Sequence, residues 1–223
     1  MNYILPLLSV LLGFGTALWL QPKEKKQLKL LLAFSGSFLL SLTVINLLPE
    51  VYEHNEVKHI GVYIMLGIIF QIVLEFFSQG AEHGHVHGHG HIHKMPWSLF
   101  ISLCLHALLE GFPVGHHHDL ALGIAVHHFP IAMILTLFFV KAGLSKNTLA
   151  AFMVGFALMT PLGTWLADTL PRLGAYYSEI TAVVIGILFH ISSTIIFESS
   201  EGHKFNIAKI TVIILGIVLA LFL

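Results

Sequence analysis

The sequence predicts an all-α polytopic membrane protein with eight transmembrane helices, on the basis of its composition and the length of its apolar runs. Of the 223 residues, 56% are hydrophobic and 10% are charged, and the mean hydropathy is +0.85. A soluble fold with this balance would expose more apolar surface than it could bury. A helix crosses about 30 Å of hydrocarbon with roughly 17 to 25 apolar residues. Eight such runs lie at about 3–20, 30–49, 60–78, 96–115, 120–140, 148–168, 180–198 and 205–223.

These runs leave no room for a soluble domain, so we expect residues 1–223 to form a single transmembrane domain in the cell (inner or plasma) membrane. Basic residues in short loops stay preferentially on the cytoplasmic side, which indicates the orientation. With the first loop inside, nine basic residues are cytoplasmic, namely Lys23, Lys25, Lys26, Lys29, Lys94, Lys141, Lys146, Lys204 and Lys209. Lys58 and Arg172 fall outside. An even number of spans then places both termini outside.

The loop between the third and fourth runs, residues 79–95, is rich in histidine and is cytoplasmic in this topology. Its histidines alternate with small or apolar residues, at His83, His85, His87, His89, His91 and His93. A Gly-His repeat cannot pack a core, so we expect a flexible segment. Because imidazoles bind borderline divalent metals such as Zn, Ni, Cu and Co, the loop is predicted to buffer or sense metal. A low-complexity linker that binds metal incidentally is the alternative.

The stretch "HALLEGFPVG" in the fourth run places His106 and Glu110 four residues apart and therefore on one helix face. The fifth run carries "AVHHFPIA", with His127 and His128 next to each other. Ionisable side chains at bilayer depth are costly unless they face a cavity or a partner, so each is a functional hypothesis. A short turn makes the two runs antiparallel neighbours. Counting from that turn puts Glu110 and His127 at similar depth, with His106 about one turn deeper.

Prolines flank these polar residues and are expected to kink both helices. Pro113 and Pro130 lack the backbone donors that would satisfy the carbonyls of Leu109 and Val126. Irregular helix at this depth is tolerated where it lines a cavity, as in transporters. Three imidazoles and one carboxylate around such a cavity predict a site for a divalent cation, and nitrogen-rich ligation favours Zn.

Histidines also occur at three other places in or next to these runs. His128 must point about 100° away from His127 along a helix, so it faces either the site or another wall. His190 in the seventh run is expected to be an ordinary hydrogen-bonded histidine. The external turn between the fourth and fifth runs is either a capture site for metal or a solvated turn, and it contains His116, His117, His118 and Asp119.

The layout and the motifs together resemble the ZIP family of divalent-metal transporters. The likeness rests on the eight runs, the histidine-rich loop, "HALLEGFPVG", "GIAVHHFPIA" and the "NLLPE" that ends the second run. The family's fourth-span pattern, His-Asn-x-x-(Asp/Glu)-Gly-x-x-x-Gly, is matched by His106, Glu110, Gly111 and Gly115, with Ala107 in place of the asparagine. Its fifth-span pattern, His-(Asn/Glu)-x-Pro-(Glu/His)-Gly, is matched at His127 and Pro130 and departs at His128, Ile131 and Ala132.

The resemblance implies import of divalent metal into the cytoplasm by an elevator-like motion of one helix bundle against another. It implies one metal site made by His106, Glu110 and His127, with His128 as a substitute ligand. Ala107 and Ile131 stand where family members with two metals have ligands. The metal is the substrate, with Zn²⁺ expected first and Fe, Mn, Co and Cd as alternatives. We expect no organic cofactor and no nucleic-acid partner; metal ions and the lipid bilayer are the expected partners, and a homodimer stays open.

Other functions compete with transport. A membrane metal sensor without transport activity would also fit the missing ligands. An intramembrane metalloenzyme is disfavoured because the His-Glu-x-x-His pattern of zinc hydrolases is absent, and we expect no enzymatic activity. Cys104 is the only cysteine, which excludes an internal disulfide and a cysteine-based metal site.

Overall fold

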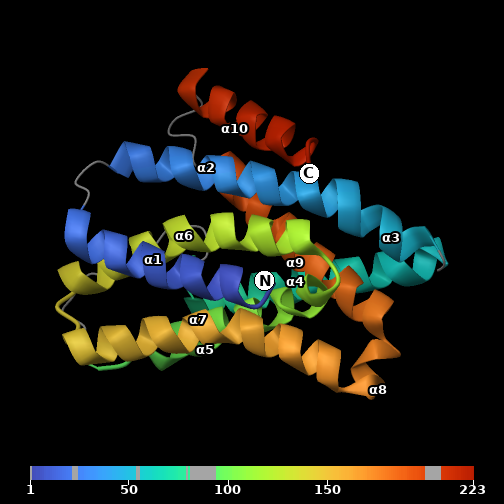
Figure 1. Cartoon of the computed structure of the whole chain (residues 1–223), viewed down its shortest axis with the longest axis horizontal. Coiled ribbons are helices and arrows are strands. Elements are labelled where there is room, and N and C mark those ends of the chain that lie inside the picture. The colour runs from blue at the N-terminus through green and yellow to red at the C-terminus, as the bar shows by residue number, and fades with distance from the viewer. Residues whose placement is uncertain (1, 22–24, 54–55, 79, 81–93, 199–206) are drawn as a thin grey trace.

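A computed structural model describes residues 2–21, 25–53, 56–78, 80, 94–198 and 207–223 of the chain. Within these residues the regular structure is entirely helical (Figure 1). The α-helices are α1 (Ile4–Leu20), α2 (Lys25–Leu42), α3 (Leu48–Glu53), α4 (Val57–Ser78), α5 (Trp97–Glu110), α6 (His118–Lys141), α7 (Lys146–Thr169), α8 (Pro171–Gly174), α9 (Tyr177–Glu198) and α10 (Ile207–Ala220). A π-helical turn, η1 (Thr43–Leu47), joins α2 to α3, and a 3-10 turn, η3 (Phe112–Gly115), follows α5.

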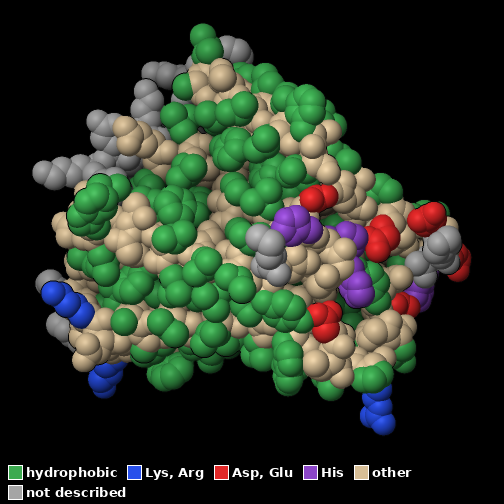
Figure 2. Space-filling model, viewed as in Figure 1, with side chains coloured by type: hydrophobic (Ala, Val, Ile, Leu, Met, Phe, Trp, Pro, Cys, Tyr) green, Lys and Arg blue, Asp and Glu red, His purple; other side chains and the backbone are tan. Residues whose placement is uncertain are grey.

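Length and composition confirm an all-α membrane protein. In the described part of the chain, six helical segments are long and apolar enough to cross a membrane, namely Gln27–Glu53, Val57–Ser78, Trp97–Gly115, His118–Lys141, Lys146–Thr169 and Tyr177–Phe197. Helices α1 and α10 are also apolar but have 17 and 14 residues. Large apolar side chains such as Trp19, Leu66 and Phe76 lie on the outer surface, where Figure 2 shows a largely hydrophobic exterior. This surface suits contact with lipid.

The long helices associate in parallel pairs that are distant in sequence: α1 with α6, α2 with α10, α4 with α9, and α5 with α7. Ser9 of α1 donates a hydrogen bond to the carbonyl of Ala125 in α6, and Gly13 lies against Phe129 one turn further along both helices. The register therefore advances in the same direction on both members of this pair. Helices α4 and α9 are also parallel, because His59 contacts Glu179 near the start of both helices and Gly67 contacts Val183 further along both.

The pairs form two groups of helices among the described residues (Figure 1). We call α1, α5, α6 and α7 the first group, and α2, α4, α9 and α10 the second group. The groups meet where α2 packs on α6 and where α4 packs on α5. Asn2 lies beside the carbonyl of Val114, and Ala220 packs with Phe38 and Leu42.

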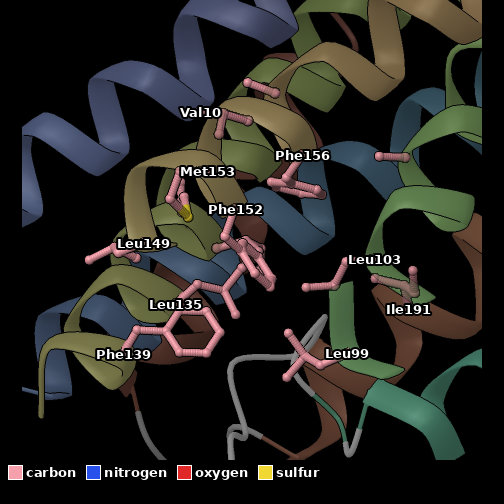
Figure 3. Packing of buried hydrophobic residues seen from close by; sticks show 14 of the residues in the cluster. Val10, Leu99, Leu103, Leu135, Phe139, Leu149, Phe152, Met153, Phe156 and Ile191 are labelled. Atoms are coloured by element: carbon pink, nitrogen blue, oxygen red, sulfur yellow. The ribbon is translucent and has the colours of Figure 1, made fainter. Parts of the chain in front are cut away.

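An apolar core fills the first group and reaches the second (Figure 3). Aromatic rings of α5, α6 and α7 meet there: the ring centroids of Phe139 and Phe152 are 4.8 Å apart, and those of Phe100 and Phe152 are 5.1 Å apart. Leu103 and Ile191 extend this core from α5 to α9. Burial of these side chains holds α5 and α6 at a fixed separation, which matters for the polar residues that they carry.

The turn between α6 and α7 shows how local sequence ends one helix and starts the next. Gly143 has a φ of 79°, a left-handed conformation that costs glycine little. Ser145 then caps α7, because its hydroxyl accepts a hydrogen bond from the backbone N–H of Thr148 at 3.2 Å. This tight connection keeps α6 and α7 in the first group.

Close glycine crossings set the spacing of the pairs. A Cβ atom at Gly186 in α9 would lie 2.0 Å from the carbonyl oxygen of Ile64 in α4, and one at Gly67 would lie 2.0 Å from that of Val183. Backbone atoms cannot move away as a flexible side chain could. Small residues are what allow transmembrane helices to approach this closely.

We therefore predict that Gly186→Ala destabilises the protein, because the new methyl group forces α4 and α9 apart. Overpacking of this kind costs about 1–3 kcal/mol. The matched control is Gly15→Ala in α1, since a Cβ atom there meets nothing within 4 Å. Thermal unfolding in detergent, followed by circular dichroism, should give a lower midpoint for Gly186→Ala and an unchanged or higher one for Gly15→Ala. Equal midpoints would contradict the crossing.

Candidate functional site

The fully buried carboxylate of Glu110 lies at the last residue of α5. His106 precedes it by four residues on the same helix face, and its Nε2 atom is 2.9 Å from Glu110 Oε1. The side chains are 3% and 0% exposed, so water does not compete for this contact. The sequence prediction that these two residues share a face is confirmed.

The second imidazole at this carboxylate comes from α6. His128 Nε2 lies 3.1 Å from Glu110 Oε2, and its side chain is 2% exposed. Each carboxylate oxygen therefore faces one ring nitrogen, from α5 on one side and from α6 on the other. His128, whose direction the sequence left open, is thus part of the site.

His127 is also buried, and its ring lies beside that of His128 with a centroid distance of 6.0 Å. It is four residues after Gly123, which packs against Leu39 and Leu42 of α2. Residues four apart share a helix face, so His127 sits toward α2 while His128 sits toward Glu110. The structure brings His106, Glu110 and His128 together and places His127 next to this set. We call His106, Glu110 and His128 the buried triad.

A side chain from the second group touches the triad. Gln71 in α4 is fully buried, and its Oε1 atom lies 3.2 Å from Nδ1 of His106. Sequence reasoning missed this residue. The available signal was a glutamine inside the otherwise apolar stretch "GIIFQIVLEFF", four residues before Glu75.

Apolar groups also lie near the triad. The ring of Phe156 in α7 lies 5.4 Å from that of His128 between centroids. Ala107 and Ile131, at the positions where the resemblance would place further ligands, are buried in the apolar core of the first group. In this environment an unpaired charge would be expensive, so the carboxylate needs its two imidazole partners.

The two prolines next to the triad lie in different local structures. Helix α5 ends at Glu110 and continues as η3, which contains Pro113, whereas α6 runs through Pro130. The carbonyl of Gly111 accepts a hydrogen bond of 2.8 Å from the hydroxyl of Thr164 in α7. The end of α5 is therefore anchored to α7, and Glu110 is held at the anchored point.

The polar side chains of the turn after η3 contact several different residues. His117 Nε2 lies 2.8 Å from Glu50 Oε2 and 3.2 Å from the hydroxyl of Tyr177. His116 stacks edge-on against Tyr177, and His118 contacts the amide oxygen of Asn2 at 3.0 Å. Asp119 lies in the first turn of α6. Figure 2 shows acidic and histidine side chains gathered on this end of the molecule.

His190, for which the sequence indicated no partner, is paired with an acidic side chain. His190 Nε2 in α9 lies 2.6 Å from Glu75 Oε2 in α4, and both side chains are partly exposed. His190 lines an open groove of about 690 Å³ between α2, α4 and α9. The remaining histidines of the prediction, His83 to His93, lie outside the described residues.

The side chains of the triad are not arranged as metal ligands in this structure. Among the residues that the structure describes, no group of three or more His, Cys, Asp or Glu side chains is arranged to hold a metal ion. In the triad each carboxylate oxygen lies close to one imidazole nitrogen, and the contact between His128 and Glu110 has the geometry of a hydrogen bond. Neither a protein-family model nor a curated protein sequence matches this chain. Membership of the ZIP family therefore stays a prediction.

The triad can be tested by a double-mutant cycle on stability. His128→Ala should destabilise the wild type, because it leaves a buried carboxylate oxygen without its donor, and should cost much less in a Glu110→Ala background. Contacting residues in one network show coupling energies of about 0.5–3 kcal/mol. His127→Ala is the control, and its effect should be similar in both backgrounds. Thermal or denaturant unfolding in detergent measures the stability of the wild type and of each variant; coupling of Glu110 to His127 but not to His128 would reverse our assignment.

Proposed function

We propose that this protein carries divalent metal cations across the cell membrane into the cytoplasm, with Zn²⁺ as the leading substrate. The observation that carries the proposal is the buried triad, in which a carboxylate and two imidazoles converge between two helices at depth in an apolar bundle. Burying a carboxylate and two imidazoles costs free energy. In a transporter these groups are useful at that depth because they replace part of the hydration of a cation.

The arrangement also indicates what cation binding must change. Each Nε2 atom now faces a carboxylate oxygen, so a cation between them has to take over these contacts. His106, Glu110 and His128 would then supply two nitrogen ligands and one or two oxygen ligands, with His127 close enough to join after a rotation of its ring. Nitrogen-rich ligation of this kind suits Zn²⁺ better than Mg²⁺ or Ca²⁺.

Other parts of the chain fit a route toward and away from the triad. Glu50, His117 and Tyr177 come together at the end of the molecule where α6 begins, and acidic and histidine side chains there would concentrate cations. His116, His118 and Asp119 surround the same entrance. The loop with His83 to His93 would receive and buffer metal on the cytoplasmic side.

Eight crossings with both termini outside are part of this proposal. Helices α1 and α10, although short, are apolar and pack against α6 and α2, which supports counting them as crossings. The resemblance to the ZIP family supports a motion of one helix group against the other. A homodimer and a metal other than Zn²⁺ remain compatible with it.

Metal uptake into liposomes that contain the purified protein tests the function. A metal-sensitive dye inside the vesicles should report uptake of Zn²⁺ by the wild type, and Glu110→Ala should abolish it because both imidazoles lose their shared carboxylate. Glu179→Ala is the matched control: this carboxylate pairs with His59 near the start of α4, and its removal should leave uptake unchanged. Wild-type protein that binds metal but moves none would instead favour the metal sensor.

Orientation is tested by labelling single cysteines in a Cys104→Ser background. Arg172→Cys should react with an impermeant maleimide in sealed cells, and His89→Cys should react only after the cells are opened. The physical basis is the retention of lysines and arginines on the cytoplasmic side. External labelling at position 89 would overturn the topology.

A further inference from the structure

Gln71, which belongs to the second group, is hydrogen-bonded to the triad. It lies in α4, is fully buried, and places its amide oxygen 3.2 Å from Nδ1 of His106. The other ring nitrogen of His106 faces Glu110 at 2.9 Å. The ring is therefore held at both nitrogens, by one residue from its own helix and one from α4.

A primary amide is suited to this position because it can either accept a hydrogen bond from Nδ1 of His106 or donate one to it. When Nε2–H of His106 donates to Glu110, a neutral ring leaves Nδ1 bare, and the amide can turn its NH₂ group toward it. When Nε2 binds a cation through its lone pair, the ring carries its proton on Nδ1, and the amide oxygen accepts that proton's hydrogen bond. Gln71 can satisfy the ring in both conditions without a change of charge.

Because the amide of Gln71 is buried, its hydrogen bond with His106 is energetically important. The Nε2 atom of Gln71 has no hydrogen-bond partner among the described residues, although no part of the side chain is exposed. Burying an amide that is only partly hydrogen-bonded costs free energy, so loss of its contact with His106 would cost more. A residue needed only to fill space in α4 would be served better by an apolar side chain of the same length.

We propose that Gln71 is a positioning residue that fixes the ring of His106 so that Nε2 faces the cation site, an inference that rests on the proposed function. Outer partners of this kind orient metal-binding histidines and raise metal affinity. Because Gln71 belongs to the second group and His106 to the first, a shift between the groups breaks this hydrogen bond and leaves the triad intact. Affinity for the cation is thereby linked to the relative position of the two groups.

Two substitutions separate positioning from packing. Gln71→Met keeps the length of the side chain but removes both polar atoms, whereas Gln71→Glu keeps an acceptor for Nδ1–H. A packing role predicts that methionine is harmless and that a buried carboxylate is harmful. A positioning role predicts the opposite order for metal affinity. Ser102→Ala is the control, because Ser102 in α5 also donates to α4, at the carbonyl of Leu74, one turn before His106.

The first measurement is Zn²⁺ affinity of the purified protein with His83 to His93 replaced by glycine and serine. We expect Gln71→Met to weaken binding about 10–100-fold, as loss of such outer partners does elsewhere. Gln71→Glu should bind at least as tightly as the wild type, and Ser102→Ala should bind like it. Binding by Gln71→Met equal to the wild type, or weaker binding by Gln71→Glu than by Gln71→Met, would overturn the inference.

The second measurement needs no metal and so separates this inference from the proposed function. In protein labelled with ¹⁵N-histidine, the ring resonances of His106, assigned with His106→Ala, should move in Gln71→Met and stay in Ser102→Ala. If they do not move, Gln71 does not hold the ring, whatever the metal results are. If they move but wild-type protein binds no divalent metal, the proposed function is wrong and the contact alone stands.

Discussion

The structure depends on the need to satisfy the carboxylate of Glu110, which is fully buried in an apolar bundle. An isolated charge at this depth would cost more than a marginally stable fold can offset. The protein meets this need with His106 from the same helix and His128 from the next one, at 2.9 Å and 3.1 Å. The end of α5 and the middle of α6 must therefore keep a fixed distance and rotation, and much of the surrounding structure maintains them.

Backbone contacts at small residues provide that constraint. Gly163 of α7 lies so close to Leu108 that a Cβ atom would be 1.9 Å from its carbonyl oxygen, and Thr164 holds the carbonyl of Gly111. On α6, the face that carries Phe129 and Ala132 receives Gly13 of α1, while Gly123 receives α2. These contacts fix the rotation of α6 from two sides. The rotation then determines which of two adjacent histidines meets the carboxylate.

The dependence on contacts between distant helices explains which parts of the fold and the site the sequence could predict. The apolar runs indicated the helical membrane fold, and the spacing of His106 and Glu110 was sufficient to place them together because both lie on one helix. The sequence favoured His127 over His128 as the partner of Glu110, whereas His128 contacts the carboxylate; the rotation that decides this depends on contacts of α6 with α1 and α2, which are about 80 to 120 residues away in the chain. Gln71 and Glu75 were missed for the same reason: their partners are on helices that lie beside α4 only in the folded protein.

The two short helices illustrate another difference. Apolar runs of about 18 residues were drawn at both ends of the sequence, and the described helices there, α1 and α10, have 17 and 14 residues. Helix α10 ends at Ala220, three residues before the end of the predicted run, and hydropathy alone does not register where a helix stops. For α10 the partner is α2, and Gly216 lies close to the backbone of Phe34 and Phe38.

The central claim is that the buried triad binds the transported cation, and X-ray absorption at the zinc edge tests it most directly. The protein is purified with His83 to His93 replaced by glycine and serine, so that the loop supplies no imidazole, and is then loaded with Zn²⁺. We predict a nearest shell of nitrogen and oxygen at about 2.0–2.1 Å with the outer scattering of at least two imidazole rings, lost in a His106→Ala, His128→Ala double variant. A spectrum without imidazole scattering, or one unchanged in the double variant, would contradict the account.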